Sequence, residues 1–249
     1  MLNTRRHAPT WLFDLDNTLH DASHAIFPAI NEKMNAYMAR VLGVDGKPAD
    51  AATVDAARLG YWRRYGATLI GMVKHHDVRA EDFLRAAHDF DDLRQMIRAE
   101  RGLNRLLQRL PGRKILLTNA PHRYSREVMR HLGLQRHFAR HISIEAMRVH
   151  GQLRPKPSKH LLRKLLKHER LAPSRCILVE DTVETLKAAK ALGLRTAWIT
   201  RYLGTRSSAP PGMLPSYRAN LTKRPIYVDV KVKSLKNLSK TLRRLGGVT

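Results

Sequence analysis

Short apolar segments alternate with amphipathic ones over the second half of the chain, and this alternation constrains the fold most. Short apolar runs are typical of buried strands, and apolar residues three and four positions apart indicate helices between them. Strands joined by helices form right-handed βαβ units within a parallel sheet. We predict strands at residues 10–15, 114–118, 141–145, 176–180, 195–199 and 226–230, and helices at 124–133, 158–171 and 182–193.

A long helical segment interrupts this alternation after the first strand. Apolar residues recur at helical spacing from about residue 22 to residue 110, and the first of these helices is expected to stop at Gly43. We therefore predict an α/β fold, a Rossmann-like parallel sheet with helices on both faces and an all-helical cap inserted after the first strand. The core is expected to comprise residues 1–19 and 109–249, and the cap residues 20–108.

The composition is that of a folded protein without a membrane segment. The chain has 249 residues, of which 43% are hydrophobic, and it contains no apolar run long enough to span a bilayer. The N-terminal residues lack the apolar core of a secretion signal, so we expect a cytoplasmic protein. The single cysteine, Cys176, excludes an intramolecular disulfide and lies in an apolar run, where we expect a buried structural thiol.

The charge is strongly basic. Forty-six lysines and arginines oppose 21 aspartates and glutamates, which gives a formal net charge of +25. The basic residues are spread along the chain, with a moderate cluster at residues 222–244, and they follow no zinc-finger or RNA-binding pattern. This distribution favours a soluble surface, with weak nonspecific nucleic-acid binding as an added expectation.

Polar side chains lie at the carboxyl ends of three of the predicted strands. The first strand ends at Asp14 and Asp16, and carboxylates this close in the sequence repel each other and are costly to desolvate without a positive partner. The carboxyl ends of parallel strands meet at one edge of the sheet, where ligands bind in open α/β folds. The side chains expected to gather there also include Thr118, Asn119, Glu180, Asp181 and Lys156.

This set of side chains suits phosphoryl transfer. Carboxylates bind Mg²⁺, a hard cation that prefers oxygen ligands, and the ion would neutralise the aspartate pair and bridge to a phosphate. One carboxylate can attack phosphorus, and a second can protonate the leaving oxygen and then activate water. Thr118, Asn119 and Lys156 can hold the remaining phosphate oxygens. Each residue type alone is also an ordinary cap, turn or loop residue, so the combination carries the prediction.

Four motifs resemble, in order, those of the phosphatases of the haloacid dehalogenase (HAD) superfamily: DLDNT, TNA, the lysine of RPKPS, and VEDT. The resemblance implies that Asp14 is the nucleophile and Asp16 the general acid and base. It also implies that Mg²⁺ binds the Asp14 carboxylate, the Asp16 backbone carbonyl and Asp181, with Glu180 as a further ligand or as a partner of the ligands. Dehalogenases of this family usually lack the second aspartate, so Asp16 favours a phosphatase.

Longer stretches resemble the bacterial pyrimidine 5′-nucleotidases, which carry a helical cap after the first motif. They are FDLDNTLHDASHAIFP, YGATLIGMVKHH, LLTNAP and VEDTVETLKAAKALGLRTAWITRYL. Within the cap stretch, Tyr65 and His76 are candidate substrate contacts, although packing or surface positions are the commoner roles of such residues. Thr185 stands where relatives often carry Asn or Asp, and we expect its hydroxyl to change the bonding of a metal-bound water without loss of activity.

The sequence thus predicts a Mg²⁺-dependent phosphomonoester hydrolase, a nucleoside 5′-monophosphatase for pyrimidine nucleotides that acts through an aspartyl-phosphate. One alternative substrate is another small ester such as phosphoglycolate or a sugar phosphate. An alternative of another class is a noncatalytic nucleic-acid-binding protein on the same fold, which would have no need of the intact motif residues. His20 and His24 follow the first motif, and surface positions are expected for both.

Overall fold

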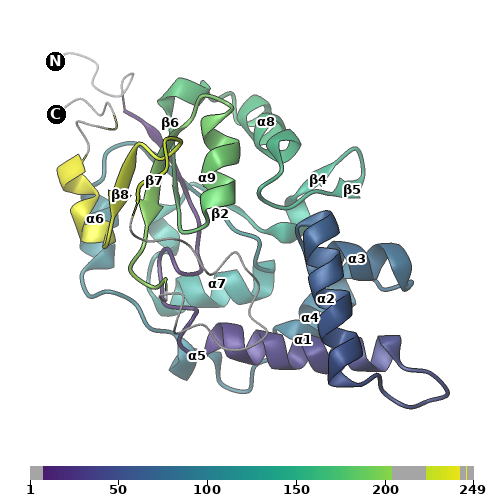
Figure 1. Ribbon diagram of the computed structural model, residues 1–249. Helices are drawn as coiled ribbons and strands as arrows, with labels where there is room; N and C mark the ends of the chain where they lie inside the picture. Colours follow the sequence, from purple (N-terminus) through teal and green to yellow (C-terminus); the bar gives the residue numbers. More distant parts are fainter. Residues whose placement is uncertain (1–7, 204–222, 242–244, 246–249) are drawn as a thin grey trace, which may run out of the picture. The chain divides into compact units, whose positions relative to one another are not determined.

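The computed structural model describes residues 8–203, 223–241 and 245 (Figure 1). These residues form two compact units. One contains residues 8–22 and the described residues from 97 onward, and the other contains residues 23–96. No helix among the described residues is both long enough and apolar enough to cross a membrane.

The first unit is built on a six-stranded parallel sheet, which confirms the predicted α/β fold. The strand order is β3-β2-β1-β6-β7-β8, so β1 lies between β2 and β6 and the chain builds outward from it in both directions. In such sheets the ligand site lies beyond the carboxyl ends of the strands, near the point where the order reverses. The strands are β1 (Thr10–Phe13), β2 (Arg113–Leu117), β3 (Arg140–Ile142), β6 (Cys176–Glu180), β7 (Arg195–Ile199) and β8 (Val230–Val232).

The predicted strand positions are confirmed most closely where the strands are buried. β6 and β7 have the predicted bounds, whereas β8 begins four residues later than expected, at Val230. A short antiparallel hairpin of β4 (Arg148–Val149) and β5 (Gln152–Leu153) was not predicted. Strands of two residues are too short to show hydrophobic alternation. The sequence could have indicated this hairpin only at its turn, formed by His150 and Gly151, which both have positive φ.

Helices of this unit connect and cover the strands. The α-helices are α6 (Leu103–Arg109), α7 (His122–His131), α8 (Lys159–His168) and α9 (Val183–Lys190). The 3₁₀ helices are η2 (Gln135–His137), η3 (Ile144–Ala146), η4 (Pro173–Arg175), η6 (Leu235–Asn237) and η7 (Ser239–Thr241).

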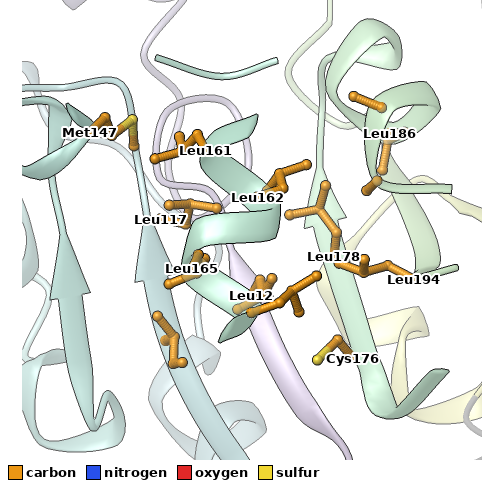
Figure 2. Packing of buried hydrophobic residues seen from close by; sticks show 14 of the residues in the cluster. Leu12, Leu117, Met147, Leu161, Leu162, Leu165, Cys176, Leu178, Leu186 and Leu194 are labelled. Carbon is orange, nitrogen blue, oxygen red and sulfur yellow. The ribbon is translucent and has the colours of Figure 1, made fainter. Parts of the chain in front are cut away.

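Alternate residues of the strands point to opposite faces of the sheet. On one face Leu12 and Leu178 pack with four buried leucines of α8 and with α9, as Figure 2 shows. Cys176 belongs to this cluster, and burial raises the pKa of its thiol to about 11, so the prediction of a structural cysteine is confirmed. On the other face Phe13 meets Phe138 edge to face, with ring centroids 5.9 Å apart.

The second unit is entirely helical in its regular structure. It contains α1 (Ile26–Leu42), α2 (Ala51–Tyr65), α3 (Thr68–His75), α4 (Ala80–Ala87) and α5 (Leu93–Met96). The side chain of Asp50 caps α2 by accepting from the Thr53 amide at 2.7 Å, and α2 ends at Gly66, whose φ is +76°. The buried Arg58 joins α2 to α1, because its guanidinium donates to Asn35 Oδ1 at 2.8 Å.

Gly71 allows α3 to pack closely against α2. A Cβ atom at this position would lie 2.1 Å from Cγ of Tyr61, which is well inside van der Waals contact. We expect Gly71→Ala to lower the free energy of unfolding by about 1–3 kcal/mol, because the Tyr61 ring or the helix must shift. Urea denaturation measures this change.

Gly60→Ala is the matched control in the same unit. It makes the same substitution within α2, where a Cβ atom would meet nothing within 4 Å. It should raise the free energy of unfolding by about 0.5–1 kcal/mol through helix propensity alone. Equal effects of the two substitutions would contradict the packing that the structure shows around Gly71.

Candidate active site

The ends of β1, β2 and β6 lie level at one edge of the sheet. Phe13 pairs in register with Leu116 on one side and with Val179 on the other. The Asp14 amide continues this pairing by donating to Val179 O at 3.0 Å. As a result, the side chains that follow the three strands begin from neighbouring positions, as the sequence predicts.

Lys156 reaches this edge from the loop before α8. Its ammonium donates to Asp14 Oδ1 at 2.6 Å and to Glu180 Oε2 at 2.7 Å, and all three side chains are at most 7% exposed. Asn119 fixes the loop through its amide, which donates to Lys156 O at 3.0 Å and accepts from Lys156 N at 2.9 Å. The structure thus joins the second and third motifs through the backbone, which the sequence did not predict.

The charges at this edge are unbalanced. Asp14, Glu180 and Asp181 are buried together, and within the described part of the chain the ammonium of Lys156 is the cation that pairs with this group, through Asp14 and Glu180. Burial, followed by repulsion from Glu180, raises the pKa of Asp14 to about 7, and the same two causes hold the pKa of Asp181 well above its ordinary value. Burial opposes the charge of Lys156, but attraction to Asp14 and Glu180 outweighs it, so the pKa of Lys156 is raised.

The acidic cluster can hold a metal ion. Asp14, Glu180 and Asp181 each offer a carboxylate oxygen, and these oxygens lie within 4.8 Å of one another. Three hard oxygen donors with an excess of negative charge suit a divalent cation such as Mg²⁺. Glu180 is engaged on both oxygens, since Oε2 accepts from Lys156 and Oε1 accepts from the Asp181 and Thr182 amides, each at 3.2 Å.

Asp16 lies in a different environment from Asp14, although only one residue separates them. Its Oδ1 accepts from the Tyr124 hydroxyl at 2.6 Å and is 2.8 Å from His20 Nε2. The surface position expected for His20 is wrong, because its side chain is fully buried. His24 is exposed, as expected. Tyr124 had no signal in the sequence beyond its place in the helix after the second motif.

Two further residues singled out in the sequence, Thr118 and Thr185, are buried near the same strand ends. Thr118 is buried directly after β2, where its hydroxyl accepts from the Ala120 amide at 3.0 Å. Thr185 is buried in the first turn of α9, four residues after Asp181. The sequence therefore named the residues at the strand ends, and the hydrogen bonds among them came from the structure.

The predicted cap residues form a cluster of aromatic rings within the helical unit. The Tyr65 hydroxyl is 2.7 Å from His75 Nε2, and the Tyr61 hydroxyl is hydrogen bonded to His76 Nε2. The ring of His75 stacks on that of Tyr61 with centroids 5.6 Å apart. The sequence did not predict a role for Tyr61, although Tyr61 lies four residues before Tyr65 and therefore shares its face of α2.

Comparison with known proteins decides the family. Residues 9–193 match the family described as haloacid dehalogenase-like hydrolase, which is more than half of the chain. The chain belongs to the haloacid dehalogenase-like hydrolases. It is therefore an enzyme of the hydrolase class, and the resemblance of its four motifs to this superfamily is confirmed.

Solved structures of this superfamily share the fold of this HAD-like hydrolase at low identity. A predicted phosphatase from Clostridium acetobutylicum is 16% identical with a TM-score of 0.61, and the match covers 95% of this chain and 98% of the other. L-2-haloacid dehalogenase from Xanthobacter autotrophicus with chloropropionic acid covalently bound is 19% identical with a TM-score of 0.54. That match covers 95% of this chain and 98% of the other. A putative HAD-hydrolase from Bacillus subtilis bound to magnesium is 16% identical with a TM-score of 0.53, and the match covers 95% of this chain and 99% of the other.

The acidic cluster predicts a stability response to Mg²⁺. At a concentration one hundred times the dissociation constant, Mg²⁺ should stabilise the HAD-like hydrolase by about 2.7 kcal/mol, which raises Tm by roughly 5–10 °C. Asp181→Asn should remove most of this shift and, without Mg²⁺, should be at least as stable as the natural chain, because it removes one of three buried like charges. Differential scanning calorimetry measures both effects.

Asp229→Asn serves as the control. Asp229 is outside the cluster and accepts from Lys190 Nζ at 2.5 Å, so its loss should lower Tm and leave the Mg²⁺ shift intact. A natural chain whose Tm does not respond to Mg²⁺ would contradict the metal site.

Proposed function

We propose that this hydrolase is a Mg²⁺-dependent phosphomonoesterase that acts through an aspartyl-phosphate. The observation that carries the proposal is the separation of two neighbouring carboxylates into different environments. Asp14 lies against Lys156 in the acidic cluster, and Asp16 is hydrogen bonded to Tyr124 and close to His20. Two carboxyl groups with distinct surroundings are typical of a site that needs one nucleophile and one proton-transfer group.

The residues of the chain then take the following roles. A carboxylate oxygen of Asp14 forms a bond to phosphorus while the bond to the leaving oxygen breaks, and Asp16 gives its proton to that oxygen. Asp16 next takes a proton from water as the water oxygen attacks phosphorus and releases Asp14. Lys156, Thr118 and Asn119 hold phosphate oxygens through both steps.

Asp14, Asp181 and the backbone carbonyl of Asp16 would hold Mg²⁺, with Glu180 as a further ligand or as a partner of the ligands. When bound, the ion neutralises the acidic cluster and the charge that develops on the phosphate. The magnesium bound to the structural neighbour from Bacillus subtilis supports this choice of metal.

For the substrate we propose a pyrimidine nucleoside 5′-monophosphate. This choice rests on the resemblance of the first motif and of residues 65–76 to the bacterial pyrimidine 5′-nucleotidases. In this proposal residues 20–108 are the cap of a core formed by residues 1–19 and 109–249, and Tyr65 and His76 are the candidate substrate contacts. The alternative substrates are phosphoglycolate or a sugar phosphate. The presence of Asp16 speaks against haloacid dehalogenation, the reaction named for one structural neighbour.

The test is phosphate release from a panel of nucleoside monophosphates and small phosphate esters, with Mg²⁺ and with EDTA. UMP or CMP should be the preferred substrates, and EDTA should abolish release. Asp14→Asn should lower the rate by about a thousandfold or more, because it removes the nucleophile. Asp45→Asn, an exposed aspartate in the helical unit, is the matched control and should be as active as the natural chain.

Each other outcome has a definite meaning. Preference for phosphoglycolate or a sugar phosphate would keep the mechanism and reject the nucleotide. Release of halide from a 2-haloacid without phosphate release from any ester would replace the phosphatase proposal with a dehalogenase. A folded protein without either activity would reject catalysis by this site.

We also propose weak, nonspecific binding of nucleic acid, and one observation favours it. The four leucines of α8 are buried, and every exposed residue of this helix is basic or histidine. Lys159, Arg163 and Lys167 follow one another at intervals of four residues and make no ion pair with any residue that the structure describes. Their charges therefore form a line along one face of α8.

Replacing Lys159, Arg163 and Lys167 together by Gln should weaken binding of a single-stranded oligonucleotide uniformly across sequences. The slope of log affinity against log salt should fall in magnitude by about two, because three phosphate contacts are lost. Fluorescence anisotropy at several salt concentrations measures the slope. Replacing Arg79, Arg85 and Arg130, each within 4.0 Å of a carboxylate, removes the same charge and should change the slope less. Equal changes would attribute binding to net charge alone.

A further inference from the structure

Two buried side chains that the proposed chemistry does not use converge on one oxygen of Asp16. The Tyr124 hydroxyl donates to Oδ1 at 2.6 Å, and His20 Nε2 lies 2.8 Å from the same oxygen. Since a carboxylate oxygen only accepts, Nε2 is the ring nitrogen of His20 that carries the hydrogen in this contact. Both donors therefore act on the same atom of the proton-transfer group.

The two donors are held rigidly by different parts of the fold. His20 is fully buried four residues after Asp16, in a loop shaped by the left-handed Asn17 (φ 56°) and by the bond from Leu19 N to Leu15 O at 2.8 Å. Tyr124 is 3% exposed on α7, and its hydroxyl is 3.4 Å from His20 Nε2. Burial of both rings means that neither donor can be exchanged for water without local rearrangement.

We propose that Tyr124 and His20 are positioning residues that set the orientation of the Asp16 carboxyl group for proton transfer. This inference rests on the proposed phosphatase function. Because Oδ1 accepts two hydrogen bonds, the proton that Asp16 exchanges with the substrate and with water is carried by Oδ2. The plane of the carboxyl group, and therefore the direction in which Oδ2 points, is fixed by the two bonds to Oδ1.

The two proton transfers give this arrangement a measurable signature. In the first step the proton of Asp16 passes to the leaving oxygen as the bond between that oxygen and phosphorus breaks and the Asp14–phosphorus bond forms. A leaving group that departs as a stable anion needs little of this help, whereas an alkoxide needs all of it. In the second step Asp16 takes a proton from water whichever ester supplied the phosphate.

Tyr124→Phe removes the hydroxyl and keeps the buried ring. The ratio kcat/KM reports on the first step, and we expect it to fall about ten- to a hundredfold for a nucleoside monophosphate and less than about threefold for p-nitrophenyl phosphate. With p-nitrophenyl phosphate, whose first step is little affected, we also expect the phosphorylated enzyme to accumulate because its hydrolysis is slowed, and mass spectrometry of the intact protein after an acid quench detects it. If Tyr124 had only a structural role, Tyr124→Phe would lower kcat/KM equally for the two esters and would leave the amount of phosphorylated enzyme unchanged.

His20 offers an independent pair of variants. His20→Leu should reproduce the dependence on the leaving group, and His20→Gln should restore part of the lost activity because its amide can also donate to Oδ1. Tyr227→Phe is the matched control, since Tyr227 packs against the core of the same unit and does not contact Asp16, and it should behave like the natural chain.

Equal losses with both esters, or no loss with either, would overturn the positioning role of Tyr124 and His20. A natural chain that hydrolyses neither ester would instead refute the proposed function, so the two failures are distinguishable.

Discussion

The contact of the Lys156 ammonium with Asp14 and Glu180 is the interaction on which the site depends. It places a positive charge among three buried carboxylates at the ends of two neighbouring strands. Without this charge, the repulsion and desolvation of these groups would oppose folding of the strand ends. The contact also ties the loop before α8 to the sheet, because Asn119 holds the Lys156 backbone from the end of β2. The residue proposed to hold phosphate oxygens is thus also a structural connection between the loop and the sheet.

Asp14 and Asp16 show how one turn of the chain separates two like charges. The hydrogen bond from the Asp14 amide to Val179 O keeps Asp14 in line with β1 and beside the acidic cluster, while the left-handed Asn17 turns the chain after Asp16. Asp16 then meets hydroxyl and imidazole donors in place of carboxylates. Different partners, and not distance along the chain, give the two residues different chemistry.

The charge of the chain is divided between its surface and this site. The formal net charge is +25, yet the buried acidic cluster carries an excess of negative charge. α8 joins the two environments, since its leucines belong to the core beneath β1 and β6 and its exposed residues are basic or histidine. In the proposed function, the positive surface would attract an anionic ester over long distances, and the acidic cluster would need a divalent cation before it could accept that ester.

The sequence by itself determined the parallel sheet, the bounds of β6 and β7, and the residues that follow the strands. Hydrophobic periodicity and motif order are local properties, and buried parallel strands depend on them most directly. Asp14, Lys156, Glu180 and Asp181 could be named for this reason. The roles of His20 and Tyr124 were decided only by the tertiary structure, because the contact between Tyr124 and Asp16 joins residues 108 positions apart. The hairpin of β4 and β5 and the close approach of Tyr61 to Gly71 likewise depend on packing, which no pattern of one segment contains.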